Sequence, residues 1–133
     1  MYSVDVVRSL YDAFARKDAE ALRALLHPDV EWIQCEGFPG GDHRRGAGEV
    51  IKKVFGGLHS AWEDFEAPVE EYLDAGDQVV ALGRYKGLHA ETQRSMTAVF
   101  AHVYDLHDGR IVRFRQFTDT WPMVAAIRGE DIS

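Results

Sequence analysis

The sequence has little of what several large classes of protein require. Its single cysteine, Cys35, excludes an internal disulfide and gives no sign of an oxidising compartment. No apolar run approaches the roughly 20 residues of a membrane-spanning helix. Only 15 Lys and Arg face 22 Asp and Glu, and the net charge of −7 disfavours nucleic acid as a partner. The first residues lack a basic region and a cleavage site, so we expect a cytoplasmic protein.

Motifs for metals, nucleotides and activated nucleophiles are also missing. The six histidines include no HxH or HExxH pair, so no metal site is expected. Gly46-Ala47-Gly48 begins like a dinucleotide fingerprint but lacks its third glycine and its βαβ context. No nucleophile-elbow motif surrounds a serine or the cysteine. If the chain is an enzyme, the chemistry that remains is acid–base catalysis without a cofactor.

The N-terminal half carries the periodicity of helices. Its length of 133 residues and hydrophobic fraction of 46% suit one soluble domain over residues 1–133. Apolar residues recur at helical spacing, and Pro28 prevents the second helix from continuing. The pattern predicts helices over about 3–16, 18–27 and 50–62, a strand over 30–35 and a glycine-rich loop over 36–48.

The C-terminal half reads as hairpin-linked strands. Turn signals separate four β-rich runs near 66–73, 78–88, 96–106 and 110–118, and Pro122 suits the first turn of a closing helix. Short joints favour antiparallel pairing. The predicted fold class is α+β, with three N-terminal helices packed on a strongly curved antiparallel sheet that forms a cone with an internal cavity.

Strand alternation indicates which side chains line that cavity. Period two places Phe100, His102 and Tyr104 on one face of their strand, and Phe114 and Gln116 on one face of the last strand. A mixture of aromatic side chains with a few polar groups is typical of a small-molecule site. An equally simple interpretation is an aromatic core whose polar groups satisfy one another.

Several short motifs, taken in order, resemble a known family. They are Arg16-Lys17-Asp18, the stretch LLHPDVEW at 25–32, the turn DAGD at 74–77, and DGRIV at 108–112 leading to RQFTD at 115–119. Their order and spacing resemble the nuclear-transport-factor-2-like (NTF2-like) superfamily, in its SnoaL-like branch of polyketide cyclases, with ketosteroid isomerase and limonene epoxide hydrolase as relatives. The resemblance implies the cone fold, on which many activities and some binding-only proteins are built.

The resemblance also implies which mechanisms do not fit. The base of ketosteroid isomerase falls at Gln34, which takes no proton, and its helix-one tyrosine falls at Leu10, one residue from Tyr11. The Asp-Arg-Asp arrangement of the epoxide hydrolases is broken, because Lys86 stands where their second Asp is expected. A SnoaL-type cyclase needs only one aspartate near Asp119, and this model survives best.

Two residues are therefore candidate acid–base groups. His102 would face the cavity and exchange a proton near neutral pH, or be a core histidine bonded to a neighbour. Asp119 matches the family's aspartate, but strict alternation turns it away from the cavity, and it would equally cap the helix at Pro122. The candidate ligand-binding residues are Trp32, Gln34, Tyr85, Phe100, Tyr104, Phe114 and Gln116.

The sequence leaves two functions open. One is a cofactor-independent enzyme of isomerase, cyclase or hydratase type, acting on a small apolar or cyclic molecule. The other is a non-catalytic ligand-binding or dimerisation module. Outward apolar residues such as Val80, Leu82, Val99 and Val103 predict a homodimer through the convex face. The basic run at 43–45 is either a solvated loop or a gate near the cavity mouth.

Overall fold

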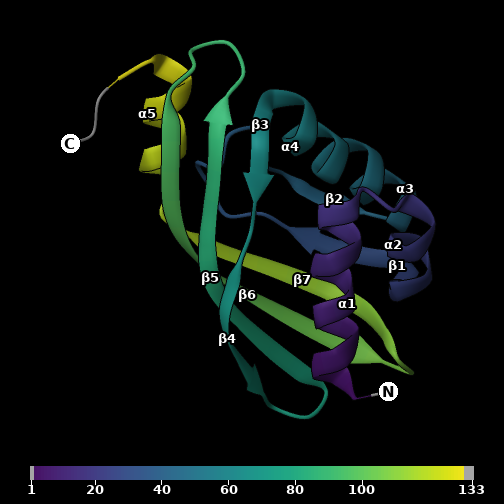
Figure 1. The fold of residues 1–133 in the computed structure, drawn as a ribbon. Helices are drawn as coiled ribbons and strands as arrows, with labels where there is room; N and C mark the ends of the chain where they lie inside the picture. Colours follow the sequence, from purple (N-terminus) through teal and green to yellow (C-terminus); the bar gives the residue numbers. More distant parts are fainter. Residues whose placement is uncertain (1, 131–133) are drawn as a thin grey trace.

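The computed structural model describes residues 2–130, in which helices lie against a single curved sheet (Figure 1). The helical elements are α1 (Ser3–Arg16), α2 (Ala19–Leu25), α3 (Ala47–Glu49), the π-helix η1 (Val50–Phe55), α4 (Gly56–Ala61) and α5 (Trp121–Arg128). The strands are β1 (Leu26–Ile33), β2 (His43–Arg45), β3 (Trp62–Glu66), β4 (Val69–Asp74), β5 (Gln78–His89), β6 (Ser95–His107) and β7 (Arg110–Thr118).

The first helical hairpin forms as its sequence predicts. Helix α1 ends at Lys17, whose left-handed φ of 57° reverses the chain. The Asp18 carboxylate then accepts a hydrogen bond from the Ala21 amide at 3.1 Å, which caps α2. The apolar stripe of α1 is buried, and Figure 1 shows this helix lying in the hollow of the sheet. The cone therefore has α1 as one of its walls.

The next helical region differs from the expected helix over 50–62. It is one continuous stretch from Ala47 to Ala61, with the π-helix η1 at its centre, and the Gly56-Gly57 pair neither ends nor interrupts it. Trp62 already belongs to β3. A π-helical turn is rare and is found most often at functional sites. Here it brings Val54 and Phe55 over the interior of the cone.

Within residues 2–130 the sheet has seven strands in the order β2-β1-β7-β6-β5-β3, and β4 also pairs with β5. All neighbours are antiparallel except β1 and β7, which are parallel. The antiparallel pairing expected for the four C-terminal strands is confirmed, and the parallel pairing of β1 with β7 adds to it. The helices α3 to α4 and the β3 to β6 meander lie between these two strands in the chain, so parallel pairing is available to them.

Two more boundaries differ from the sequence prediction. Strand β1 begins at Leu26, before Pro28, and its register against β7 is irregular between Leu26 and Glu31. A proline is tolerated there because the ladder is interrupted. The expected loop over 36–48 contains the short strand β2, which pairs with β1 at the edge of the sheet. The closing helix α5 ends as expected at Gly129, with a φ of 72°.

The two faces of the sheet have the predicted alternation. His102 of β6 pairs across the ladder with Gln116 of β7 and with Ala81 of β5, and all three are buried. Val99 and Phe117 point the other way and are 55% and 53% exposed. The concave face therefore carries the core. No helix within residues 2–130 is long and apolar enough to cross a membrane.

Candidate ligand-binding cavity

An apolar cavity of about 40 Å³ lies between α1, the η1–α4 region and the concave face of the sheet. A cavity of this size has room for a few water molecules. Its lining residues are Leu10, Tyr11, Phe14, Trp32, Gln34, Val54, Phe55, Leu58, Phe65, Ala67, Tyr85, His102, Tyr104, Phe114 and Gln116. No carboxylate is among them.

The polar groups of the cavity form a chain centred on His102. Its Nδ1 lies 2.6 Å from the Tyr11 hydroxyl, and its Nε2 lies 2.5 Å from the Tyr85 hydroxyl. The Tyr104 hydroxyl donates to the Tyr11 hydroxyl at 2.8 Å. Phe100 stacks on the imidazole with ring centroids 3.9 Å apart. Both ring nitrogens of His102 are therefore occupied by phenols, and the ring is fixed in plane.

Gln116 fixes the other end of this chain. Its Oε1 accepts a hydrogen bond from the Cys35 amide at 3.2 Å, and its Nε2 donates to the Tyr85 hydroxyl at 2.8 Å. The backbone amide is only a donor, so the orientation of the Gln116 side chain is set. This role explains why a polar residue on the concave face of β7 is 4% exposed yet satisfied.

Burial sets the protonation state of every group in the chain. It lowers the pKa of His102 from 6.5 to about 3, so the imidazole is neutral at pH 7. It also raises the pKa of Tyr11, Tyr85 and Tyr104 above the usual 10, and these phenols keep their protons. The cavity is thus lined by neutral hydrogen-bonding groups. A neutral imidazole with so low a pKa is a weak proton acceptor.

A larger cleft of about 640 Å³ adjoins the cavity on its outer side. The two hollows share Tyr11, Phe14, Phe65 and Ala67 as lining residues. Charged side chains also border the cleft, namely Arg8, Asp12, Lys17, Asp64 and Glu66. The side chains shared between α1 and the β3–β4 region therefore separate the cavity from this cleft.

Asp119 does not reach His102. It lies exposed just beyond the end of β7, and its Oδ1 accepts a hydrogen bond from the Trp121 amide at 3.2 Å, at the start of α5. No bulge interrupts the end of β7 near it, so the alternation of the strand carries its side chain away from the cavity. The expectation that His102 and Asp119 share one cavity is corrected accordingly.

The other sequence candidates are gathered around the cavity. Trp32, Gln34, Tyr85, Tyr104, Phe114 and Gln116 line it, while Phe100 lies behind His102. Tyr11 was not among the candidates, although it bonds His102 directly. Tyr11 sits on the apolar stripe of α1, and the family comparison put the helix-one tyrosine one residue away, at Leu10. That near match was the available signal.

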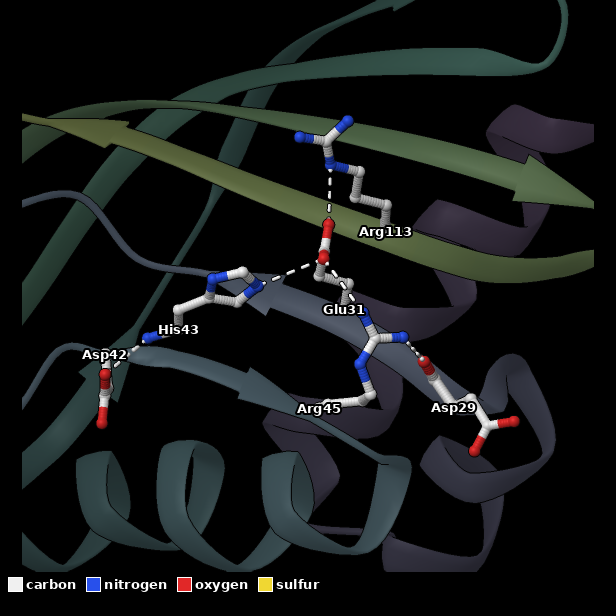
Figure 2. A network of polar contacts seen from close by, with 6 residues as sticks. All are labelled: Asp29, Glu31, Asp42, His43, Arg45 and Arg113. Carbon is white, nitrogen blue, oxygen red and sulfur yellow. Dashed lines mark hydrogen bonds and ion pairs between the residues drawn. The ribbon is translucent and has the colours of Figure 1, made fainter.

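The basic run at 43–45 lies elsewhere than expected. It forms β2 on the outer edge of the sheet, and Figure 2 shows the side chains of His43 and Arg45 pointing toward Glu31. Glu31 Oε2 is 3.2 Å from both His43 Nε2 and Arg45 Nη2, and its Oε1 is 3.1 Å from Arg113 Nε. These groups are not among the residues that line the cavity, and the run forms a strand in place of the expected loop.

Nowhere in residues 2–130 do three or more His, Cys, Asp or Glu side chains gather closely enough to hold a metal ion. The polar groups available to a ligand are those of the Tyr–His–Tyr chain, Gln34 and Trp32.

Comparisons with known proteins agree with this fold. The family model of the SnoaL-like domain matches residues 7–114. An NTF2-like protein from Burkholderia thailandensis E264 is 35% identical over 96% of this chain and 98% of its own, with a TM-score of 0.90. One from Burkholderia pseudomallei K96243 is 30% identical over 93% and 95%, with a TM-score of 0.84. No curated protein matches the chain.

A third structure shares the fold at lower identity. TerC, co-crystallized with polyporic acid, is 24% identical over 94% of this chain and 97% of its own, with a TM-score of 0.83. The fold of this chain is thus shared with solved structures. The chain belongs to the SnoaL-like family of the NTF2-like fold.

Proposed function

We propose that this protein binds a small, largely apolar ring compound in the cavity around His102. The supporting observation is that the cavity holds a complete chain of neutral polar groups and no carboxylate, with both nitrogens of His102 occupied. Such a site orients a ligand by hydrogen bonds and apolar contact without requiring proton transfer. TerC, which was co-crystallized with a small molecule, supports binding in this fold.

The cavity must widen to accept a ring, and we expect the helical stretch over it to move outward. Val54, Phe55 and Leu58 form this wall, and they flank Gly56-Gly57 within a π-to-α junction. A Cβ at Gly57 would meet nothing within 4 Å, so packing does not hold this position. Small residues at such junctions absorb backbone movement when a site opens.

A blocking variant tests binding, with 1-indanone as the probe and calorimetry as the measurement. Leu58→Trp fills the wall and should weaken binding at least tenfold. Leu88→Trp is the matched control, because Leu88 is also half-buried but lines no part of the cavity. Equal binding by both variants would place the ligand elsewhere, and absence of binding to the unmodified protein would contradict the proposal for rings of this size.

A second candidate is cofactor-independent acid–base catalysis in the same cavity, of the isomerase, cyclase or hydratase type. The observation that favours it is the row of neutral, buried hydroxyl donors, since such donors stabilise charge that develops on a substrate oxygen. His102 would take the proton, although its pKa of about 3 makes it a weak base. Asp119 is too far out to share this role.

Proton exchange distinguishes the two candidates. In this reaction the base removes a proton from the carbon next to a ketone, and the enolate recovers a deuteron from D2O. Catalysis predicts that the protein speeds exchange at that carbon of 1-indanone by about 10²-fold or more, and that His102→Gln loses the effect. Binding without exchange supports the ligand-binding function alone.

The convex face supports a proposal of homodimerisation. Val99 and Phe117 are 55% and 53% exposed there, and Val80, Leu82 and Val103 beside them are half-buried. An apolar patch across neighbouring strands is unusual for a monomer. Sedimentation should give a dimer at micromolar concentration, and Val99→Lys should shift it to the monomer. A monomer of 15.0 kDa from the unmodified protein would refute this.

A further inference from the structure

One edge of the curved sheet, formed by β3 and β4, is open on its outer side within residues 2–130. The two strands follow one another along the same side of β5, and in this part of the chain each pairs with β5 alone (Figure 1). The backbone amides and carbonyls on their other side are left without a strand partner. An edge of this kind can pair with the backbone of another extended chain.

Backbone hydrogen bonds show which groups face the open side. The Pro68 carbonyl accepts a hydrogen bond from the Arg84 amide at 3.1 Å, and Val69 lies opposite Gly83 in the ladder. The backbone groups of Pro68 therefore point toward β5, and those of Val69 point away from it, because neighbouring residues alternate. The N–H that Pro68 lacks belongs to the β5 side, so the open edge loses no donor there.

The open edge forms one wall of the cleft of about 640 Å³ that lies outside the cavity. All six consecutive residues of the stretch 64–69 line this cleft. Successive side chains of an extended chain point to opposite faces, so a hollow that touches all of them lies along the edge. Helix α1 forms the opposite wall through Arg8, Tyr11, Asp12 and Ala15. The cleft is therefore a groove between a strand edge and a helix.

The strand wall of this groove is acidic. The segment 62–74 contains no Lys, Arg or His, and its six carboxylates are those of Glu63, Asp64, Glu66, Glu70, Glu71 and Asp74. Arg84 of β5 pairs with one of them, Glu70, at 2.8 Å. The basic residues of the groove, Arg8 and Lys17, come from α1 and its C-terminal cap. The Arg8 guanidinium lies over the Tyr72 ring, 5.0 Å from its centroid.

This charge decides which chain suits the groove. Two copies of the same edge would set carboxylates against one another, and like charges on neighbouring strands are destabilising. A second copy of this chain is therefore a poor occupant. A basic strand instead places its Lys and Arg side chains beside the carboxylates, and attraction between opposite charges also speeds its association.

We propose that the groove between α1 and the β3–β4 edge is a docking site for an extended peptide segment rich in Lys and Arg, which adds a strand beside Val69. The partner is a protein with an exposed basic segment of this kind. Irregular register between Glu63 and Glu66, and between Val69 and Glu71, interrupts the edge, so the paired stretch is short. The site is separate from the cavity around His102 and does not depend on ring binding.

Three synthetic peptides of equal length test the proposal by fluorescence anisotropy at pH 7. The basic peptide is acetyl-Lys-Val-Arg-Val-Lys-Val-Arg-amide. The second has Glu in place of every Lys and Arg, and the third is the basic peptide N-methylated at every amide between residues, which keeps its charge but blocks strand pairing. The basic peptide should bind at least tenfold more tightly than either of the others.

Each other outcome overturns the proposal. Equal affinity for the acidic peptide would remove the charge argument, and equal affinity for the N-methylated peptide would remove strand addition. Absence of binding by all three peptides would show that the groove is not a docking site for basic segments.

Hydrogen exchange shows whether the peptide lies on this edge. In ¹⁵N-labelled protein, saturation with the basic peptide should slow exchange of the Val69 amide at least tenfold. The Arg45 amide on the opposite edge is the internal control, because the Gly46 amide donates to the Val30 carbonyl at 2.8 Å and the backbone of Arg45 therefore points outward from β2. Unchanged exchange at Val69, or equal slowing at both amides, would overturn the assignment.

A pair of charge variants tests the carboxylates of the groove. Asp64→Asn combined with Glu66→Gln removes two charges from the strand wall, and asparagine tolerates the φ of 51° at position 64. This double variant should weaken binding of the basic peptide at least fivefold. The matched control is Asp108→Asn combined with Glu20→Gln, since Asp108 has a φ of 50° and neither residue lines the groove. Equal weakening in both double variants would show that net charge alone attracts the peptide, and the site would be refuted.

Discussion

The two faces of strands β1 and β7 carry polar clusters of opposite character. On the convex side, Glu31 pairs with Arg45, His43 and Arg113, in contact with solvent. One residue further along each strand, Trp32 and Phe114 stack on the concave side beside a chain of neutral phenols and an imidazole. Because successive side chains of a strand point to opposite faces, the ionic network lies on one face of the sheet and the neutral network on the other.

The difference between the two polar clusters follows from their exposure to solvent. Charges on the convex face stay hydrated and gain little from pairing, typically 0 to about 1 kcal/mol for each pair. A charge on the concave face would lose its hydration, and burial accordingly keeps His102 neutral. Substitutions in the outer network are therefore expected to cost little stability. Substitutions in the inner, buried network are expected to cost more.

The largest effect is expected from a methyl group added inside the cone. A Cβ at Gly83 would lie 2.2 Å from the Pro68 carbonyl oxygen and 2.7 Å from Phe100 Cζ. Since the first contact is with backbone, Gly83→Ala should lower the free energy of unfolding by about 3 kcal/mol. Urea denaturation measures it, and a loss below about 1 kcal/mol would show that the concave wall is looser than described.

The next effect is on the pH dependence of the free energy of unfolding, and it comes from His102. The pKa of His102 is lowered from 6.5 to about 3 by burial, so below pH 6.5 the unfolded chain binds a proton that the folded protein does not. The free energy of unfolding therefore falls as the pH falls, by about 2 kcal/mol between pH 7 and pH 5 from this group alone. His102→Gln should lose that part of the pH dependence.

The control for this measurement is the unmodified protein in the same buffers. Its other titrating groups are shared with the variant, so the difference between the two curves reports His102. Parallel curves would mean that the pKa of His102 is the same in the folded and unfolded states, so that burial does not keep the imidazole neutral below pH 6.5.

A smaller effect is expected on the convex face. Glu31→Gln removes the anion that Arg45, Arg113 and the imidazole of His43 share, and it should lower the free energy of unfolding by no more than about 1 kcal/mol, because these side chains remain hydrated. In 1 M NaCl the difference should shrink further. A loss that is larger and insensitive to salt would show that the outer network is effectively buried.

The smallest effect is a gain. Gly57→Ala places a methyl group in open space on a helix, and it should raise the free energy of unfolding by about 0.5 kcal/mol through helix propensity. The same substitution is made in Gly83→Ala, where the added methyl group meets backbone atoms instead of open space. If the helical wall moves when ligand enters, association of 1-indanone should also slow, as stopped-flow fluorescence would record.

The fold could be predicted where local chemistry decides it. Residues close together in the sequence determine the apolar stripe of α1 and the Asp18 cap. They also determine the turns between β4, β5, β6 and β7. The parallel contact between β1 and β7 was missed because it joins segments far apart in the sequence. Pairing of that kind depends on the curl of the whole sheet.

The site was predicted in part for the same reason. Period two found His102, Tyr85 and Gln116, but the partner of His102 on α1 depends on how the helix is rotated against the sheet. Tyr11 was therefore missed, because the resemblance to the family placed the helix-one tyrosine at Leu10, one residue before it. Asp119 was proposed from a motif, and only the structure shows that its side chain lies exposed and accepts a hydrogen bond from the Trp121 amide.

The parallel pairing of β1 with β7 also bears on how the protein is made. Trp32 and Phe114 face each other across that pairing, yet most of the chain lies between them. A nascent chain that has produced α1, α2 and β1 lacks Phe114, on which Trp32 stacks, until the last strand leaves the ribosome. Contacts between such distant segments form slowly, because closing the long loop costs entropy first. The cavity is thus expected to be among the last parts of the molecule to assemble.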